Sequence, residues 1–285
     1  MDKATLRDLV YYIAGERGFR PGIIEKDYYL TKVLNAINDH LSQDIVFKGG
    51  TLLHKVYLDY RRLSEDLDFS YNGETDISTR GKRSSAIAAV REKIPAFLSM
   101  VGLTSDNPDG TGHNKSTQYL FKINYESIIT NRKESIKLEI SLREPLILPP
   151  EYVTVNHFFQ EPFTGEDILP RGKILAMSLQ ESVAEKLKAA ISRLTPAIRD
   201  YYDLEQFIRI DFNFSHFDFK EIVDKKLQQD GYTRDYSNNL GLTDQAIQEL
   251  KRTMSSDLTP MLRTDDTFDL DRVLAYFNEL FAVTQ

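Results

Sequence analysis

Residues 47–71 constrain the fold more than any other part of the chain, because Gly49 and Gly50 there precede a short predicted helix and Asp66 and Asp68 follow it. An apolar run at residues 45–47 predicts a buried strand. A Gly-Gly-Thr turn follows it, and residues 51–59 are expected to form a helix. Residues 66–71 then predict a second strand, so strand, turn, helix and strand follow in close succession.

Asp66 and Asp68 lie two residues apart in the second predicted strand. Side chains at this spacing point to the same face, so both carboxylates project together. Two adjacent carboxylates repel each other and are costly to keep ionised unless a cation lies between them. Hard oxygen ligands favour Mg²⁺, with Mn²⁺ as the alternative metal. The pair therefore predicts a divalent metal site.

The Gly-Gly-Thr turn has the size and chemistry of a phosphate site. Free backbone N–H groups at the start of a helix can bind phosphate, and glycine lets the phosphate oxygens approach closely. Thr51 adds a hydroxyl donor, and Lys48 adds a nearby positive charge. The residues concerned are Lys48, Gly49, Gly50 and Thr51. Such a turn is common by itself, but beside the two carboxylates it indicates that a nucleoside triphosphate (NTP) is bound as Mg²⁺–NTP.

Two metal ions handling a triphosphate usually need a third protein carboxylate. Residues 134–142 alternate as a strand, and Glu139 lies on the polar face together with Lys137 and Ser141. Glu139 is therefore the candidate third ligand and a candidate catalytic residue. The alternative is that this face is simply the solvent-exposed edge of a sheet.

Composition narrows the class of protein. The chain has 285 residues and no cysteine, which excludes disulfides, zinc–thiolate sites and cysteine nucleophiles. Neither a signal segment nor an apolar run of about 20 residues is present, so we expect a cytoplasmic protein without a membrane partner. The net charge of −7 argues against nucleic-acid binding by the whole surface, but it leaves room for a local basic groove.

The order of predicted elements indicates an α+β fold with two domains. Residues 1–177 are expected to form a mixed sheet flanked by helices, and residues 178–285 an all-helical domain. The predicted strands cover residues 45–47, 66–71, 117–126, 134–142, 152–158 and 173–177. The predicted helices cover residues 3–18, 22–41, 51–59, 79–101, 178–193, 197–210, 217–229, 243–255 and 269–282.

The helix at residues 178–193 carries a second candidate phosphate site. At about 100° per residue, Lys186 and Arg193 lie together at one edge of its apolar stripe, with small residues beside them. Two cations with room around them suit an anionic ligand such as phosphate. Lys188 projects elsewhere and is expected to be solvated.

Asp200 lies in the first turn of the next predicted helix. A carboxylate there interacts favourably with the helix dipole, so capping is one interpretation. The other is functional: Asp200 acts as a base, or it holds Lys186 or Arg193 in place. The sequence leaves both open.

Taken together, these motifs resemble the AbiEii/AbiGii-type nucleotidyltransferase toxin family, within the DNA polymerase β-like nucleotidyltransferase superfamily, over roughly residues 25–204. The segments that carry the resemblance are Glu25-Lys26-Asp27, Lys48-Gly49-Gly50-Thr51, Arg62-Leu63-Ser64-Glu65-Asp66-Leu67-Asp68-Phe69, the helix with Lys186 and Arg193, and Arg199-Asp200-Tyr201-Tyr202-Asp203-Leu204. The last predicted helices match no motif.

The resemblance implies a bilobed toxin, encoded beside an antitoxin, that uses Mg²⁺ and an NTP. It also implies transfer of nucleotides onto RNA, notably the acceptor end of tRNA. By position, Asp66 and Asp68 would bind metal, Lys186 would hold phosphate, and Asp200 would be a catalytic or orienting carboxylate. The residues that would contact the triphosphate are Gly49, Gly50, Thr51 and Ser64, with Arg62 in the same motif and Arg193 beside Lys186.

Two alternatives remain from the sequence. The nucleotide could be transferred to a hydroxyl of a small molecule or a protein. The chain could also be a non-catalytic interaction module that retains the fold. Against the module stands the pair Asp66 and Asp68, because a binding module has no need of two costly adjacent carboxylates.

Overall fold

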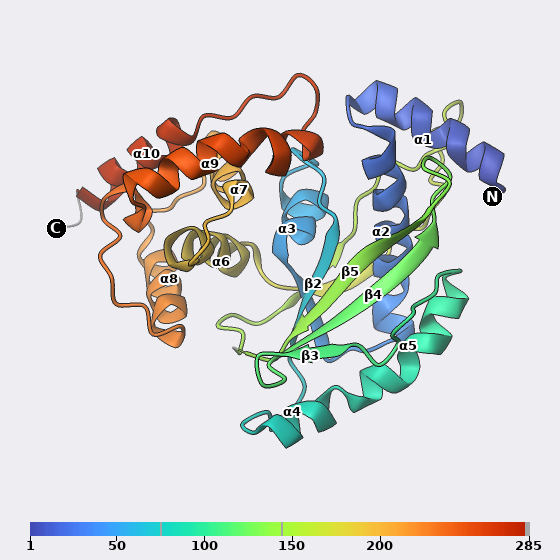
Figure 1. Ribbon diagram of the computed structural model, residues 1–285, viewed down its shortest axis with the longest axis horizontal. Coiled ribbons are helices and arrows are strands. Elements are labelled where there is room, and N and C mark those ends of the chain that lie inside the picture. The colour runs from blue at the N-terminus through green and yellow to red at the C-terminus, as the bar shows by residue number, and fades with distance from the viewer. Residues whose placement is uncertain (75, 144, 283–285) are drawn as a thin grey trace. The chain divides into compact units, whose positions relative to one another are not determined.

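The computed structural model describes residues 1–74, 76–143 and 145–282 (Figure 1). The chain divides into two compact units, Met1–Ser178 and Leu179–Gln285. The predicted boundary after residue 177 lies one residue before this division. The first unit contains a mixed sheet and helices, and the second is helical in its described part, so the predicted α+β class is confirmed. Among the described residues, no helix has the length and apolar character needed to cross a bilayer.

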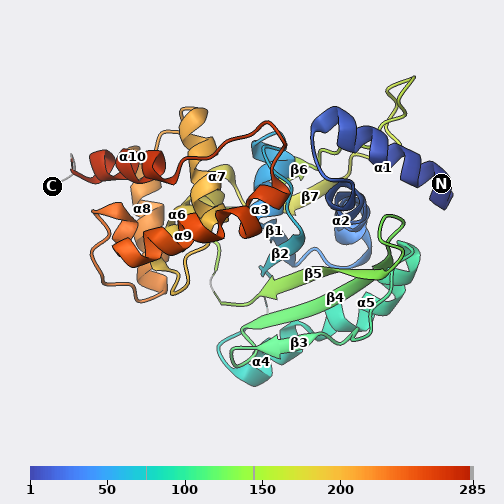
Figure 2. The same cartoon turned by 45° about the horizontal axis from the view of Figure 1, so that its top comes forward.

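A seven-stranded sheet forms the centre of the first unit, with the order β3-β4-β5-β2-β1-β7-β6 (Figures 1 and 2). Within it β2 pairs antiparallel with β1 and parallel with β5, while β4 and β5 are antiparallel. The strands are β1 (Ile45–Lys48), β2 (Asp66–Tyr71), β3 (Thr111–His113), β4 (Gln118–Glu126), β5 (Lys133–Ser141), β6 (Glu151–Thr154) and β7 (Lys173–Ala176).

The helices of the first unit are α1 (Lys3–Arg17), α2 (Pro21–His40), α3 (Gly49–Leu52), the π-helical turn η1 (Leu53–Tyr57), α4 (Arg80–Ala86) and α5 (Ala88–Met100). Those of the second unit are α6 (Leu179–Ser192), α7 (Ile198–Arg209), α8 (Phe217–Gln229), the 3₁₀ turn η2 (Asn239–Gly241), α9 (Asp244–Asp257), the 3₁₀ turn η3 (Thr259–Met261) and α10 (Leu270–Ala282).

One face of the sheet forms the core of the first unit. Alternate residues of β2, β4 and β5 pack there against α2 and α5, as the period of two in each strand dictates. The alternate residues of these strands lie on the opposite face, where Asp66, Asp68 and Glu139 are half-buried. The sheet therefore separates an apolar core from a polar face, and the predicted site residues lie on the polar face.

The helix predicted at residues 51–59 is α3 followed by the π-helical turn η1, and three other predicted elements also differ from the structure. The helix predicted at residues 79–101 is divided into α4 and α5 at Ile87, whose ψ of −6° departs from helical geometry. The loop predicted at residues 104–116 contains the short strand β3. The strand predicted at residues 152–158 ends at Thr154, because the N–H of Asn156 bonds to the carbonyl of Lys55 in η1 rather than to β7.

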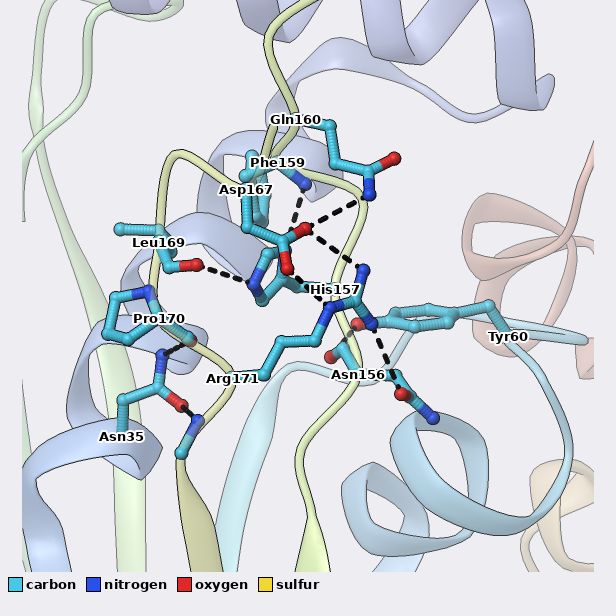
Figure 3. Close-up of polar contacts among 11 residues, drawn as sticks. Asn35, Tyr60, Asn156, His157, Phe159, Gln160, Asp167, Leu169, Pro170 and Arg171 are labelled. Atoms are coloured by element: carbon cyan, nitrogen blue, oxygen red, sulfur yellow. Dashed lines mark hydrogen bonds and ion pairs between the residues drawn. The ribbon is translucent and has the colours of Figure 1, made fainter. Parts of the chain in front are cut away.

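Residues 155–172 form the loop that joins β6 to β7, and polar contacts hold this loop in place (Figure 3). The buried ring of His157 accepts a hydrogen bond from the N–H of Phe159 at its Nδ1 and contacts the carbonyl of Leu169 with its Nε2, at 3.2 and 2.9 Å. With Nδ1 as acceptor, Nε2 is the donor. Arg171 forms an ion pair with Asp167 at 2.6 Å. The loop is thus held in one conformation without regular secondary structure.

An aromatic cluster forms part of the core of the second unit. The rings of Phe212, Phe214 and Phe219 contact one another edge to face, with centroids 5.0–5.6 Å apart. Phe277 of α10 contacts Phe214 at 5.1 Å, which ties the last described helix to this core. Such edge-to-face contacts add to the stabilisation from buried area.

Candidate active site

The turn after β1 brings Gly49 against the carboxylate of Asp68. Gly49 has a φ of +78°, in the left-handed region that favours glycine. A Cβ on Gly49 would come within 3.0 Å of the Cβ of Asp68 and closer still to its carboxylate. Glycine is therefore required at this position both by the backbone conformation and by the contact.

Strand pairing aligns three charged side chains across three strands. Lys48 of β1 pairs with Asp68 of β2, and Asp68 pairs with Glu139 of β5, so all three project from the polar face. In the next row Asp66 pairs with Lys137. The alternation of each strand, together with this register, places the predicted carboxylates side by side.

The pKa of Asp68 reflects the negative charge gathered around it. Burial raises the pKa of Asp68 to about 6, and the charge of Glu139 adds to the rise, while Lys48 opposes it. Ionisation of Asp68 is therefore less favourable in the protein alone than ionisation of an exposed aspartate. A divalent cation at Asp66 and Asp68 would relieve this repulsion, and carboxylate oxygens are the ligands that Mg²⁺ prefers. The residues present thus suit a metal ion.

Glu139 has partners that the sequence did not predict. Lys137 contacts its Oε2 at 2.9 Å, and Gln118 of β4 donates a short hydrogen bond to its Oε1. Burial acts to raise the pKa of Glu139, but these hydrogen bonds outweigh it and the pKa is lowered. Among the described residues no three acidic or histidine side chains are arranged to hold a metal ion. Glu139 is bound to Lys137 and Gln118 here, and its role as a third ligand stays a prediction.

The remaining residues of the turn have specific roles in the structure. Thr51 donates its hydroxyl to the backbone carbonyl of Asp66 at 2.5 Å, so that hydrogen fixes the turn to β2 rather than facing a phosphate. Arg62 is only 2% exposed, and its guanidinium donates to the carbonyl of Leu63. A Cβ on Gly50 would lie 2.8 Å from the Arg62 Nη2 atom and 3.3 Å from the Ser64 hydroxyl. Both side chains therefore lie against the turn, Arg62 as a buried support.

The motif Glu25-Lys26-Asp27 on α2 supplies structural contacts in the first unit. Glu25 is buried and accepts hydrogen bonds from the Ser127 hydroxyl and the Ile128 N–H, both at 2.6 Å. Lys26 forms an ion pair at 2.7 Å with Glu65, the residue before Asp66. These contacts connect α2 to the segment that carries the carboxylates.

Asp27 forms a buried ion pair with Lys55 of η1 at 2.8 Å. Lys55 also donates to the hydroxyls of Thr31 and Tyr60, at 2.8 and 2.9 Å. The sequence motifs did not identify Lys55. A lysine within the apolar segment after the Gly-Gly turn was the signal that could have found it.

In the second unit the predicted residues also come together. Lys186 contacts Asp200 at 2.8 Å and Asp203 at 2.9 Å, and Arg193 contacts the other oxygen of Asp200 at 2.9 Å. Both carboxylates are buried, with exposed fractions of 2% and 0%. Of the two interpretations of Asp200, the structure supports a partner that holds Lys186 and Arg193.

The prediction for Lys188 was wrong. Its side chain is only 15% exposed and forms an ion pair with Asp230 at 2.6 Å, so it is not a solvated lysine. Helical periodicity gave the direction of the side chain correctly, but it could not reveal that a carboxylate lies in that direction. Lys188 still differs from Lys186, which contacts two carboxylates rather than one.

Comparison with known proteins places the chain in a family. Residues 32–281 match the family model described as "Nucleotidyl transferase AbiEii toxin, Type IV TA system". No curated protein matches the sequence. Among solved structures, the nucleotidyltransferase toxin MenT4 of Mycobacterium tuberculosis H37Rv is similar, with a TM-score of 0.61 and 18% identity, over 100% of this chain and 99% of that one.

JHP933 of Helicobacter pylori is similar with a TM-score of 0.51 and 17% identity, over 93% of this chain and 92% of that one. At these identities the two structures support the fold, while the family model covers most of the sequence. The resemblance inferred from the motifs is confirmed. The chain belongs to the AbiEii family of nucleotidyltransferase toxins of type IV toxin–antitoxin systems, and it is a nucleotidyltransferase.

Proposed function

We propose that this nucleotidyltransferase moves a nucleotide from an NTP to an RNA in the presence of Mg²⁺, and that the RNA is a tRNA accepting the nucleotide at its acceptor end. The observation that carries the proposal is the row of Lys48, Asp68 and Glu139 beside a glycine that no other residue could replace. This row combines crowded carboxylates with a lysine at the end of the strand that leads into the glycine turn.

Asp66 and Asp68 would hold Mg²⁺, or Mn²⁺ in its place, which when bound activates the attacking hydroxyl and neutralises charge on the departing pyrophosphate. Gly49 and Gly50 lie against Asp68 and Arg62, where any other residue would push a side chain into the site, and the N–H groups of this turn would bind the triphosphate. Lys48, on the same face, adds a positive charge beside Asp68. These residues bind and orient the NTP.

In the transfer step the acceptor hydroxyl oxygen forms a bond to the α-phosphorus of the NTP. The bond from that phosphorus to the oxygen bridging to the β-phosphate breaks, and pyrophosphate leaves with the bonding electron pair. The hydroxyl proton passes to a carboxylate oxygen of Glu139. Lys137 and Gln118 hold Glu139 in its ionised form, which is the form able to accept a proton.

In the second unit, Arg193 and Lys186 would hold phosphate groups, and Asp200 would act as a positioning residue. Asp200 contacts both cations through its two oxygens, so it fixes the spacing between them. The Arg193 side chain is 49% exposed and can reach an anionic ligand. As a member of a type IV toxin family, the protein is expected to have a cognate antitoxin and to act in the cytoplasm, where tRNA and NTPs are present.

The test is transfer of label from each of the four α-labelled NTPs to total tRNA, with Mg²⁺ or with EDTA. We expect label on RNA with at least one NTP, equimolar pyrophosphate, and loss of both with EDTA or in Asp66→Ala. The matched control is Asp39→Ala, which removes an exposed aspartate near the end of α2. Label on a protein or a small molecule, with none on RNA for any NTP, would contradict the RNA acceptor.

A further inference from the structure

On the polar face of the sheet, the carboxylates of β2 have different neighbouring strands in the two directions. β1, with Lys48 and the Gly-Gly turn after it, lies on one side of β2 and its carboxylates. β5 and then β4 lie on the other side. The register fixes the same order for the side chains, since Asp68 pairs with Lys48 in one direction and with Glu139 in the other.

An in-line displacement uses the two sides differently. The entering oxygen and the leaving pyrophosphate lie on opposite sides of the α-phosphorus. With the triphosphate at the turn beside β1, the pyrophosphate leaves on that side. The acceptor hydroxyl then enters over β5 and β4, and the rest of the acceptor strand lies over the same two strands.

The polar face of β5 and β4 carries two lysines directly opposite each other. Lys137 of β5 pairs with Lys122 of β4, and the next pair along the strands is Glu139 with Leu120. Like charges directly opposite each other destabilise a sheet. Glu139 contacts Lys137 at 2.9 Å and so compensates the charge of this lysine of the pair.

Lys122 is exposed, and its surroundings leave it accessible to a ligand. The charge of Lys122 contributes to lowering the pKa of Asp106, but the hydrogen bond of Asp106 is with Lys133, at 2.6 Å. A cationic side chain held opposite another cation, on the acceptor side of a reaction centre, has the chemistry of a phosphate contact. The acidic protein needs such local contacts, because its net charge of −7 repels nucleic acid overall.

We infer that Lys122, next to the Lys137–Glu139 pair, binds a backbone phosphate of the RNA strand that carries the acceptor hydroxyl. The inference rests on the proposed transfer to RNA and adds a binding residue and a direction to it. The acceptor strand runs over β5 and β4, and the triphosphate stays on the β1 side. Lys122 therefore acts on the RNA and not on the NTP.

The experiment compares Lys122→Ala and Lys122→Arg with Lys173→Ala, a matched control that removes an exposed lysine at the start of β7. Initial rates of labelled transfer are measured against the concentration of total tRNA and, separately, of the NTP. tRNA binding without NTP is measured over a series of salt concentrations.

For Lys122→Ala we expect a KM for tRNA raised about 5- to 20-fold and an unchanged KM for the NTP. The slope of log K for tRNA against log salt should become shallower by about 0.7, the value for one single-strand phosphate contact. Lys122→Arg should restore most of the affinity, and Lys173→Ala should resemble the wild type.

Two results would overturn the inference while leaving transfer to RNA intact. One is a Lys122→Ala variant that matches Lys173→Ala in KM for tRNA and in salt slope. The other is an equal rise in KM for the NTP, which would place Lys122 on the triphosphate side. If the wild type labels no RNA with any NTP, the proposed function fails as well, so the two failures are distinguishable.

Discussion

Replacing Gly49 by alanine should disable the site through Asp68. The φ of +78° at this position costs a residue with a Cβ about 1–2 kcal/mol. In addition, the new Cβ would lie 3.0 Å from the Cβ and 3.1 Å from the Cγ of Asp68, and nearer to its Oδ2. Ordinary van der Waals contact begins at 3.4 Å, so the carboxylate has to move.

The size of that movement sets the expected loss of activity. Contact with the carboxylate oxygen is the tightest of the three, so a displacement of about 1 Å is required at the atom that binds metal. A displacement of this size in a reacting group costs about 10²-fold in rate, or about 2.7 kcal/mol of transition-state stabilisation. Gly49→Ala should therefore lose about 100-fold in transfer and most of its Mg²⁺-dependent NTP binding.

A second glycine separates the two effects. Gly165 also has a positive φ, +72°, but a Cβ there would have no heavy atom within 4 Å. Gly165→Ala should lower the free energy of unfolding in urea by about 1–2 kcal/mol and keep wild-type transfer. Gly49→Ala should lose at least as much stability. If Gly49→Ala binds Mg²⁺–NTP and turns over within 3-fold of Gly165→Ala, the contact with Asp68 is not what requires glycine.

Three further predictions concern charged groups. Lys186→Ala should lose about 3 kcal/mol of stability in urea, because the buried carboxylates of Asp200 and Asp203 each lose their ion pair with Lys186. It should also lower transfer more than Lys188→Ala does, and equal losses of transfer in the two variants would contradict this. Asp68→Asn should raise the stability of the protein in EDTA by about 1–2 kcal/mol, since burial and Glu139 make the charge at Asp68 unfavourable, while abolishing transfer; a loss of stability would count against charge crowding. Burial lowers the pKa of His157 below its ordinary 6.5, so the unfolded chain takes up a proton first and stability falls as the pH drops from 7 to 5. His157→Gln should flatten that decline in pH-dependent unfolding, and an unchanged slope would refute it.

Periodicity predicted the polar face of the sheet because that face depends on alternation alone. Asp66, Asp68 and Glu139 all occupy positions that alternate with buried residues, so their shared side followed from the sequence. The register did not, since it depends on which strands are neighbours. Only the parallel pairing of β2 with β5 shows that Glu139 lies next to Asp68 and that Lys137 lies next to Asp66.

Hydrogen-bond partners were the other property that the sequence could not supply. The hydroxyl of Thr51 was expected to face a phosphate, but it donates to the carbonyl of Asp66. The segment after Leu52 was expected to be an ordinary helix, yet it forms the π-helical turn η1, where the N–H of Leu58 bonds to the carbonyl of Leu53 at 2.8 Å. A period of 3.6 residues cannot reveal such a turn, because it is confined to a few residues.

The π-helical turn connects the motif at residues 25–27 of α2, which is distant in sequence from Asp66 and Asp68, to the segment after the Gly-Gly turn. π-Helical turns are rare and occur often at functional sites, where tertiary contacts have to hold them. Here Lys55, within η1, is buried and bound to Asp27 of α2 at 2.8 Å, while Lys26, its neighbour, binds Glu65 beside Asp66. Removing Asp27 would leave the buried Lys55 without its carboxylate directly behind the Gly-Gly turn. The motif on α2 therefore contacts both the segment after the Gly-Gly turn and the segment before the carboxylate strand. Its charged sequence alone does not distinguish such structural contacts from a catalytic role.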